Sequence, residues 1–577
     1  MEKRWVIKAE PERETVAKLI EELGVSRPIA VILAQRGIHT FQEAKAFFRP
    51  EIQDLHDPFL MKGMQDAVNR IEQAIASNEN ILVYGDYDVD GTTAVALMYS
   101  FLTRDYEQVG YYIPDRYSEG YGISQAGIEF AEDNSFSLVI ALDCGIKEVE
   151  LIAEAKNRGV DFIVCDHHTP GAVIPDAIIL NPKQKDCYYP YKELCGCGVG
   201  FKLIQAINQS RNQEIDTIFE YLDLVMVAIG ADIVPMTGEN RILAYYGLHV
   251  LNNTPRIGFQ RLLELANKTG ELSVTDVVFS IAPRINAAGR IESGNQAVQL
   301  LLAKTFEEVD EISKTINAHN ETRKGLDKEI TDEALKMIQE DDWLLNATST
   351  VVFNETWHKG VVGIVASRLT ETYYRPTIVL TESNGFAVGS ARSVKGFNIY
   401  EAIDQCSDLL TQFGGHFYAA GLTMELENVV PFKLKFNEIV AASISKKQLV
   451  PEIEIDCAID FRDIFEEQRS SIPRFYRVMK QLAPFGPGNM RPVFVSRNVK
   501  DTGSSRILKD EHLKLSIMQE DYPDIVMNGI AFGMSEWYTS LQEGLVDIVY
   551  TIEENYWNGN VSLQLMVKDI RKSKPIF

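Results

Sequence analysis

Four short apolar runs, each followed by a polar residue or a turn, constrain the fold of this chain most strongly. They are residues 81–84 (ILVY), 137–142 (SLVIAL), 161–165 (DFIVC) and 177–180 (AIIL). Helical patterns such as 148–159 separate them, and strands that alternate with helices are typical of a parallel sheet with helices on its faces. The carboxyl ends of parallel strands meet at one edge, where such sheets bind ligands. Three of the four runs lead into an aspartate or histidine, so the sequence predicts a shared site at this edge.

The first run leads into GDYDVDG (85–91), whose aspartates are Asp86, Asp88 and Asp90. A calcium loop, a solvated acidic turn and a metal-binding site all share these carboxylates. An EF-hand beginning at Asp86 would need glutamate at its twelfth position, where Leu97 stands, and a helix before the loop instead of a strand. Three carboxylates at one strand end repel one another unless a cation offsets their charge. A metal site is therefore the favoured interpretation.

Further candidate ligands are Asp143, His167 and Asp232, with His168 either a ligand or a group that orients one. Asp232 lies within the stretch 221–236, which fits a strand or a buried helix equally well. Oxygen-rich ligation with one or two imidazoles suits Mn²⁺ or Mg²⁺ better than Zn²⁺. Because this set exceeds the needs of one ion, we expect a pair of ions that clamps the oxygens of a displacement at phosphorus.

The length of 577 residues predicts several domains. We expect a parallel-sheet α/β domain with an N-terminal extension over 1–304, a connecting helix over 305–345, a smaller α/β domain over 346–450 and a β-barrel over 451–577. Apolar residues at helical spacing flank the polar stretch 317–325, which is expected to face solvent. Short strands and turns, with a hairpin at Trp557-Asn558-Gly559, indicate the barrel.

The formal net charge of −25 argues at first against nucleic acid as the partner. Most of the acidic excess lies in the first 350 residues, with the expected metal site, and local basic tracks can still bind phosphates. The N-terminus lacks the apolar core of a signal peptide and no apolar run is long enough to span a membrane, so we expect a cytoplasmic protein. Cys195 and Cys197 form a lone C-x-C without a second pair at zinc spacing.

An ordered set of motifs resembles a known family. GDYDVDG (85–91), LDCG (142–145), CDHHTP (165–170) and GADIVP (230–235) are similar to the motifs of the DHH phosphoesterases. Six more motifs extend the resemblance, in the same order, to the RecJ-type single-strand-specific exonucleases: IPDRYSEGYGIS (113–124), PRINAAGRI (283–291), WHKGVVGIVASRL (357–369), GSARS (389–393), FGGHFYAAG (413–421) and LAPFGPGNMRPVF (482–494). The Asp-His-His triplet alone is a weak signal, whereas the ordered set covers nearly the whole chain and is specific.

The resemblance implies a 5′→3′ exonuclease of DNA repair and recombination that degrades single-stranded DNA to 5′-mononucleotides with Mn²⁺ or Mg²⁺. It implies a DHH domain, a DHH-associated domain and a C-terminal OB-fold that binds single strands. It also implies a ligand set of Asp86, Asp88, Asp143, His167 and Asp232, in which Asp143 bridges the ions. Asp90 and His168 match the pattern in supporting or ligating roles that the sequence does not separate.

Phosphate-binding residues are expected in turns of small residues. GSARS offers backbone amides and an arginine fork, or else a turn held by serine hydrogen bonds. The full set of candidates, most of them from the resemblance, is Arg116, Arg284, Asn286, Arg290, Ser390, Arg392, Ser393, Gly414, Gly415 and His416. Within this set, His416 would contact the scissile phosphate or the leaving oxygen, and the residues of 283–291 would contact DNA or brace the domain junction.

No motif that reads bases is visible, so we expect binding through phosphates and stacking, with Tyr121, Phe417 and Tyr418 as stacking or core residues. Two positions depart from the family pattern. Tyr84 stands where some relatives have histidine, and Asp115 replaces the usual asparagine before Arg116, which adds negative charge near the expected phosphate path.

Three other functions remain open at this point. An oligoribonuclease or cyclic-dinucleotide phosphodiesterase of the DHH family would be shorter and lack the barrel. A non-catalytic DNA-binding scaffold would have lost ligands, whereas this chain has them all. An inorganic pyrophosphatase has no obvious use for the barrel. We expect a monomer, and the sequence leaves open whether a helicase or a single-strand-binding protein recruits it.

Overall fold

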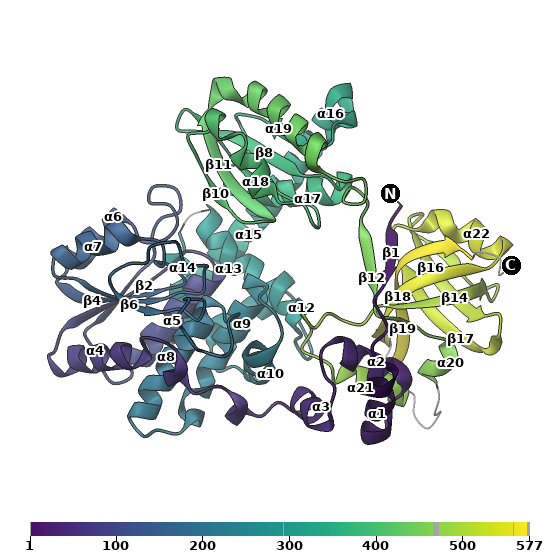
Figure 1. Ribbon diagram of the computed structural model, residues 1–577, viewed down its shortest axis with the longest axis horizontal. Coiled ribbons are helices and arrows are strands. Elements are labelled where there is room, and N and C mark those ends of the chain that lie inside the picture. The colour runs from purple at the N-terminus through teal and green to yellow at the C-terminus, as the bar shows by residue number, and fades with distance from the viewer. Residues whose placement is uncertain (1, 292, 466–471, 558, 574–577) are drawn as a thin grey trace.

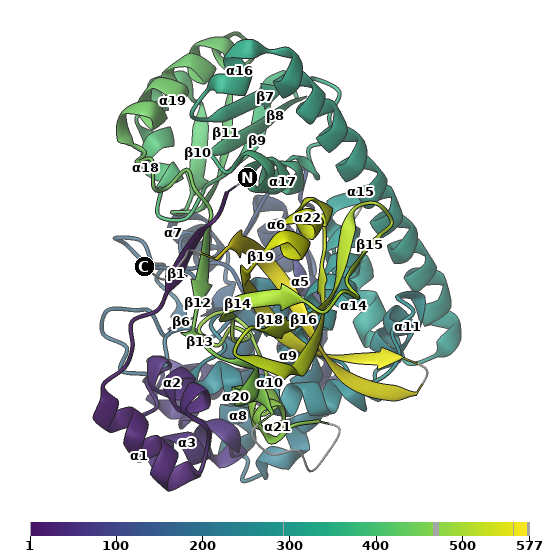
Figure 2. The same cartoon turned by 90° about the vertical axis from the view of Figure 1, so that its right-hand side faces the viewer.

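The computed structural model of the chain describes residues 2–291, 293–465, 472–557 and 559–573. In Figure 1 the parallel-sheet domain lies on the left, a second α/β domain at the top and a β-barrel on the right. The 35-residue helix α15 (Phe306–Glu340) joins the first two bodies and runs along one side of the molecule in Figure 2. Within the described residues, no helix combines the length and apolar character that a membrane span requires.

The first domain is built on a five-stranded parallel sheet of order β3-β2-β4-β5-β6. Its strands are β2 (Asn80–Gly85), β3 (Val109–Tyr112), β4 (Phe136–Leu142), β5 (Asp161–Cys165) and β6 (Ile178–Leu180). The four apolar runs are therefore parallel strands, as predicted. The sequence analysis does not predict β3, because its four residues are all only partly buried.

Helices cover both faces of this sheet, so its strands are buried from two sides. Helices α4 (Met64–Ala76), α5 (Val89–Leu102) and α8 (Gly196–Ser210) pack into one core, and α6 (Gln125–Asp133) and α7 (Val149–Asn157) into another. The stretch 221–236 contains helix α9 (Leu222–Asp232), whose residues 222–230 are all buried. A helix that is apolar all round carries no 3.6-residue period, which explains why the pattern did not separate helix from strand.

Helix α15 begins at a capping box in which Thr305 accepts from Glu308 N. The predicted full exposure of 317–325 is wrong. Asn320 is 1% exposed, and Arg284 Nε donates to Asn317 Oδ1 at 3.1 Å. Polarity alone suggested solvent, whereas helix α13 (Ala282–Ile291) packs against α15.

The second α/β domain has a mixed sheet of order β10-β11-β9-β8-β7. Strand β7 (Thr350–Phe353) is parallel to β8 (Thr377–Ser383), and β9 (Phe386–Arg392), β10 (Gln412–Gly415) and β11 (Ala419–Glu425) add antiparallel pairs. Helices α17 (Val362–Tyr373), α18 (Ile399–Asp404) and α19 (Val429–Ser443) pack on it. The register sets Ser390 opposite Gly421, and Gly421 opposite Gly414, so GSARS on β9 and the two glycines of the GGH motif on β10 lie on either side of β11.

The C-terminal body is a barrel of order β13-β14-β18-β19-β17-β16-β15, with an additional β14–β16 pairing. Its strands are β13 (Cys457–Ala458), β14 (Phe494–Asp501), β15 (Arg506–Leu508), β16 (His512–Gln519), β17 (Tyr522–Ala531), β18 (Val546–Trp557) and β19 (Asn560–Lys572). Strands β18 and β19 pair antiparallel up to Trp557 and Asn560, which is the register of a two-residue hairpin. Asn558 of the predicted turn lies outside the described residues.

The apolar faces of the N-terminal helices pack mainly on the barrel, although the sequence analysis grouped this extension with the parallel-sheet domain. Helices α1 (Arg13–Leu23), α2 (Arg27–Gln35) and α3 (Phe41–Phe48) contribute to the same apolar core as the barrel strands. Strand β1 (Arg4–Ile7) pairs in parallel with β12 (Glu452–Ile455), which leads into the barrel. The exact domain boundaries given above stay predictions.

Arg241, on α10 (Gly238–Asn252), ties the first domain to both ends of the chain. Its guanidinium is 4% exposed, donates to the carbonyl oxygens of Phe47, Leu482, Ala483 and Pro484 at 2.8–3.3 Å, and lies 3.8 Å above the Phe47 ring. A buried cation that satisfies several carbonyl groups at once holds these three segments together.

We predict that Arg241→Ala lowers the free energy of unfolding by about 3 kcal/mol, because it leaves several buried carbonyl groups without donors. Arg261→Ala is the matched control, since Arg261 makes only surface ion pairs with Glu264 and Asp310, and should cost less than about 1 kcal/mol. Urea denaturation of both variants measures the difference. Equal destabilisation by the two substitutions would contradict this role for Arg241.

Candidate metal centre and phosphate cavity

The turn after β2 holds its aspartates in a defined arrangement. Asp86 directly follows the strand, and Asp88 caps α5 by accepting from Gly91 N at 3.0 Å. Only glycine fits at position 91, because a Cβ there would lie 2.4 Å from the carbonyl oxygen of Asp86. Both carboxylate oxygens of Asp86 are buried without a hydrogen-bond partner among the described residues. A buried unpaired carboxylate is costly, so Asp86 fits the role of a metal ligand.

Asp90 connects the first motif to helix α8. It is 2% exposed, and its two oxygens accept from the backbone N–H groups of Gly196 and Cys197 at 2.6 and 2.7 Å. The same carboxylate keeps one oxygen 3.9 Å from His167 Nε2. Asp90 therefore shapes the site through α8 and still faces it.

Asp143 follows β4 in a left-handed backbone conformation with φ of 60°. Aspartate tolerates this region better than most residues. Its N–H donates to Cys165 O at 2.9 Å, and its Oδ1 is buried without a hydrogen-bond partner among the described residues. A Cβ at Gly196 would lie 2.5 Å from that of Asp143, so the start of α8 packs directly against this residue.

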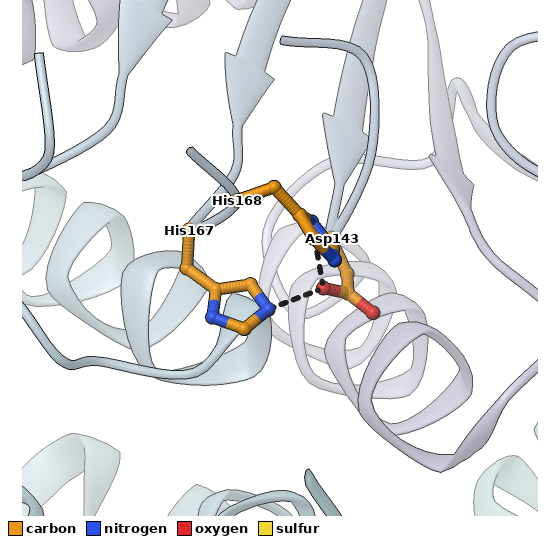
Figure 3. Close-up of side chains that lie close together, drawn as sticks. All are labelled: Asp143, His167 and His168. Carbon is orange, nitrogen blue, oxygen red and sulfur yellow. Dashed lines mark ion pairs between the residues drawn. The ribbon is translucent and has the colours of Figure 1, made fainter. Parts of the chain in front are cut away.

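Both histidines of the triplet after β5 are directed at Asp143, as Figure 3 shows. His167 Nε2 lies 3.2 Å from Asp143 Oδ1 and 3.7 Å from Asp232 Oδ2, and His168 Nδ1 lies 4.0 Å from Asp143 Oδ1. Three separate elements thus bring their side chains to one point at the carboxyl edge of the sheet.

Asp166 is a residue that the sequence analysis did not select, although it opens the Asp-His-His triplet. One carboxylate oxygen accepts from His168 Nδ1 at 2.7 Å and from His168 N at 3.0 Å, and the other accepts from Ile146 N at 3.0 Å. Burial would lower the pKa of His168, but its hydrogen bond to Asp166 and the nearby carboxylates raise it. Asp166 therefore orients the His168 ring at the edge of the site.

Asp232 is the last residue of α9, and Ile233 ends the helix with φ of 58°. The loop that follows is supported from the barrel side. Met236 N donates to Pro487 O at 2.6 Å, and a Cβ at Gly488 would lie 2.9 Å from the Thr237 side chain. The motif at 482–494 is thus structural here and braces the segment that carries Asp232.

Crowding of carboxylates dominates the electrostatics of the site. Burial, and then the neighbouring carboxylates, raise the pKa of Asp86 and Asp143 well above the ordinary value. The same causes raise the pKa of Asp90 to about 7 and of Asp232 to about 8. Burial lowers the pKa of His167 to about 3, so its imidazole is neutral and able to donate a lone pair. Without a cation this site keeps protons that a cation would displace.

The donor set fits divalent cations that prefer oxygen. One ligand atom from each of Asp143, His167 and His168 lies within 4.8 Å of the others, and the same holds for Asp90, His167 and Asp232. Two overlapping groups, beside the unpaired carboxylate of Asp86, match the ligand preferences of Mn²⁺ and Mg²⁺.

A cavity of about 510 Å³ lies between the two α/β domains. Arg116, Tyr121 and Arg290 line it from the first domain, and Gly363, Ser390, Arg392 and Gly414 are among the residues of the second. Tyr121 links the cavity to the metal centre, because its hydroxyl donates to Asp143 O at 3.0 Å and lies 3.3 Å from His168 Nε2.

The cavity carries three arginines that no carboxylate of the described residues pairs with. Within the described residues, Arg116, Arg290 and Arg392 form no ion pair. Burial, and then the charges of Arg116, Arg323 and Arg392, lower the pKa of Arg290 to about 10. Arg392 donates to Ser390 Oγ at 2.7 Å, and a Cβ at Gly363, at the start of α17, would lie 3.2 Å from Arg392 Nη2. Helix N-termini and arginine forks bind phosphates, so the cavity suits a phosphate group.

Other candidates do not line this cavity: Arg284, Asn286, Ser393, Gly415 and His416. Arg284 donates to Ser280 O at 2.7 Å as well as to Asn317, which is the bracing alternative. Ser393 Oγ donates to Phe397 O at 2.7 Å and stabilises its turn.

The turn after the GGH motif is exposed. Burial, and then the charges of Lys147, His168 and Lys183, lower the pKa of His416, which places this side chain toward the first domain. Phe417 and Tyr418 are 42% and 53% exposed, so they are free to stack and are not core residues.

Asp115 keeps its negative charge, and its hydrogen bonds direct the carboxylate into its own loop. Its Oδ1 accepts from Tyr117 N, Ser118 N and Ser118 Oγ at 2.8–3.0 Å, and the backbone hydrogen bond from Ser118 lowers its pKa. The carboxylate is therefore engaged inside its own loop.

Three family models match the chain. They are the DHH family N-terminal domain over residues 80–229, the DHHA1 domain over 346–442 and the RecJ OB domain over 455–569. Among solved structures, that of RecJ in complex with Mn²⁺ from Thermus thermophilus is similar with a TM-score of 0.85 and 27% identity, covering 99% of this chain and 80% of that chain. A structure of the same protein in complex with Mg²⁺ gives a TM-score of 0.79.

Two curated relatives carry the comparison over the whole chain. The single-stranded-DNA-specific exonuclease RecJ of Bacillus subtilis is 38% identical over 99% of this chain and 71% of the relative. The protein of the same name from Escherichia coli is 30% identical over 93% of this chain and 95% of the relative.

We predict that Mn²⁺ stabilises the protein more at pH 8.5 than at pH 6. The pKa values of Asp90 and Asp232 are raised on folding, to about 7 and about 8. The stability they contribute without metal is therefore lost as the pH rises through this range, and a cation restores it. Melting temperatures with EDTA and with Mn²⁺ at both pH values test this. Asp232→Asn should reduce the pH dependence of the Mn²⁺ shift, and an equal shift at both pH values in the unmodified protein would contradict the account.

Proposed function

The chain belongs to the RecJ family of single-strand-specific exonucleases, and from this premise we propose that it degrades single-stranded DNA from the 5′ end to 5′-mononucleotides. The observation that carries the proposal is the pairing of two features at one junction. A cluster of carboxylates and imidazoles, most of them buried, lies beside a cavity whose arginines form no ion pair within the described residues. The first suits divalent cations and the second suits a terminal phosphate, so a strand end and a scissile bond can be held together.

We propose that Asp86, Asp88, Asp143, His167 and Asp232 hold two divalent ions, Mn²⁺ or Mg²⁺. When bound, such ions polarise a phosphoryl oxygen and make water nucleophilic near neutral pH. Asp143 has the unpaired oxygen that a bridging role needs, and it faces both histidines. His168, which Asp166 orients, is placed at the edge of the centre to bind an ion or to contact a phosphate oxygen.

The arginine cavity would select the end of the strand. Arg116, Ser390 and Arg392, with the start of α17, supply charge and donors for a terminal phosphate monoester. A terminal phosphate fixed there sets the next phosphodiester at the metal centre, which accounts for release of one nucleotide at a time. His416, on the facing domain, would contact the scissile phosphate from the other side.

The barrel supports a polymer as substrate. A closed single-strand-binding body has no use in hydrolysis of pyrophosphate or of a dinucleotide, and the complete ligand set has no use in a non-catalytic scaffold. Binding of single strands independent of sequence, by phosphate contact and stacking, follows. Within this proposal the protein is a cytoplasmic monomer that a helicase or a single-strand-binding protein recruits to DNA.

The deciding experiment uses single- and double-stranded DNA and RNA labelled at the 5′ or 3′ end, with Mn²⁺ or Mg²⁺. We expect labelled mononucleotide to appear first from the 5′ label of single-stranded DNA. Release of the 3′ label first would overturn the polarity. Cleavage of dinucleotides alone, or of pyrophosphate, would overturn the substrate class.

We predict that Asp143→Asn lowers kcat on single-stranded DNA by at least about 10³-fold, because a metal-bridging carboxylate contributes several kcal/mol to such reactions. Asparagine suits this test better than alanine, since it accepts the left-handed backbone of position 143. The variant should melt no lower than the unmodified protein in EDTA, because it removes a buried carboxyl group that is costly to ionise.

Asp133→Asn, on the exposed end of α6, is the control and should leave kcat unchanged. Near-normal turnover by a folded Asp143→Asn variant would exclude Asp143 from the metal centre.

A further inference from the structure

The loop 113–122, between β3 and α6, delivers two side chains to the site from its outer side. Arg116 stacks 4.8 Å above the Tyr87 ring and lines the phosphate cavity. Tyr121 donates to Asp143 O at 3.0 Å. Within the described residues, Arg116 has no carboxylate partner, so its position depends on the stacking and on the backbone of its own loop.

Glu119 holds this loop through three hydrogen bonds. Its Oε1 accepts from Asp115 N at 2.8 Å, and its Oε2 accepts from Tyr112 Oη at 2.9 Å and Ser124 Oγ at 2.5 Å. Glu119 has no cationic partner among the described residues, and all three of its donors are neutral. A carboxylate that accepts three hydrogen bonds joins the start of the loop, the preceding strand and the following helix cap.

Tyr84 completes the same network from the strand that carries the first motif. It is 1% exposed, its hydroxyl donates to Gly122 O at 3.0 Å, and Ser124 N donates to that hydroxyl at 3.2 Å. The parallel register sets Tyr84 beside Tyr112, and their rings stack with centroids 5.4 Å apart. Tyr84 directly precedes the Gly-Asp pair of the first motif, so the loop and the metal turn share one support.

We infer that Glu119 and Tyr84 are positioning residues that hold the loop 113–122, and with it Arg116, in the place where a 5′-terminal phosphate binds. This inference rests on the proposed function, which it deepens by assigning recognition of the strand end to a pre-formed loop. Neither residue lines the cavity, so they act through the loop and not by contact with DNA. A loop already in place costs less ordering when the phosphate arrives, which strengthens binding of phosphorylated ends.

Glu119→Gln is the central variant, because the amide nitrogen that replaces one oxygen cannot accept a hydrogen bond. Tyr84→Phe removes only the hydroxyl and keeps the stacked ring. Glu107→Gln is the matched control, since it makes the same charge change at an exposed residue just before β3.

Two measurements separate the loop from the chemistry. The first measurement is trypsin cleavage after Arg116 in the DNA-free, Mn²⁺-loaded protein. Cleavage should be about tenfold faster in Glu119→Gln than in the control, and faster by a smaller factor in Tyr84→Phe. The second measurement is the preference for phosphorylated ends, given by kcat/KM on 5′-phosphorylated strands divided by kcat/KM on 5′-hydroxyl strands. This preference should fall about tenfold because KM for the phosphorylated strand rises, while kcat and the affinity for Mn²⁺ stay unchanged. Adding Glu119→Gln to Arg116→Ala should change this ratio little further, because both act through one contact.

Unchanged trypsin cleavage after Arg116 in both folded variants would overturn the inference, as would an unchanged preference for 5′-phosphorylated strands. If Glu119→Gln does not fold, Tyr84→Phe alone decides, because it leaves the packing intact. Failure of the unmodified protein to degrade single-stranded DNA would count against the proposed function, and the trypsin measurement would still decide whether Glu119 and Tyr84 hold the loop.

Discussion

Repulsion among carboxylates at one edge of a sheet is the constraint on which this structure depends. Parallel strands bring their carboxyl ends together, and here those ends carry Asp86, Asp143 and the triplet that begins at Asp166. Such a cluster survives folding only because backbone donors, a neutral imidazole and protons share its charge until a cation binds. Much of the remaining chain, from the start of α8 to the loop after β3, can be understood as support for this unfavourable arrangement.

The second domain contributes positive charge next to the carboxylates, and the barrel supports the segment that follows Asp232. Within the described residues, the cavity arginines form no ion pair with the carboxylates of the metal centre. The two sets are nevertheless close, because the charge of Asp88 opposes the lowering of the Arg290 pKa. The carboxylates of the first domain and the arginines of the cavity therefore suit a molecule that bears both a terminal phosphate and a metal-binding oxygen. The segment that leads into β14 of the barrel also contributes, since Pro487 O accepts a hydrogen bond from Met236 N, beyond Asp232.

Much of the fold follows from local pattern, because buried parallel strands are continuous apolar runs and their polar ends mark the site. The sequence pattern did not predict secondary structure or burial where tertiary packing determines them. Helix α9 is apolar on every side, so it shows no helical period. Asn320 is covered by a neighbouring helix, and β3 is too short and too little buried to give an apolar run. Asp115 looked like a misplaced charge until its hydrogen bonds within the loop were visible. The sequence predicted the residues that the structure brings together at the edge of the sheet, whereas Asp166 and Glu119, which orient other residues, became recognisable only from their hydrogen bonds.

The N-terminal helices have a consequence for the order in which the chain is made. Their apolar faces complete the core of the barrel, whose strands lie more than four hundred residues later in the sequence. During synthesis these helices therefore leave the ribosome long before their partner exists, while the parallel-sheet domain between them can already fold. A chain truncated before the barrel would keep the carboxylates and histidines of the candidate metal centre and yet expose an apolar surface on its first helices, which favours aggregation and recognition by chaperones and proteases.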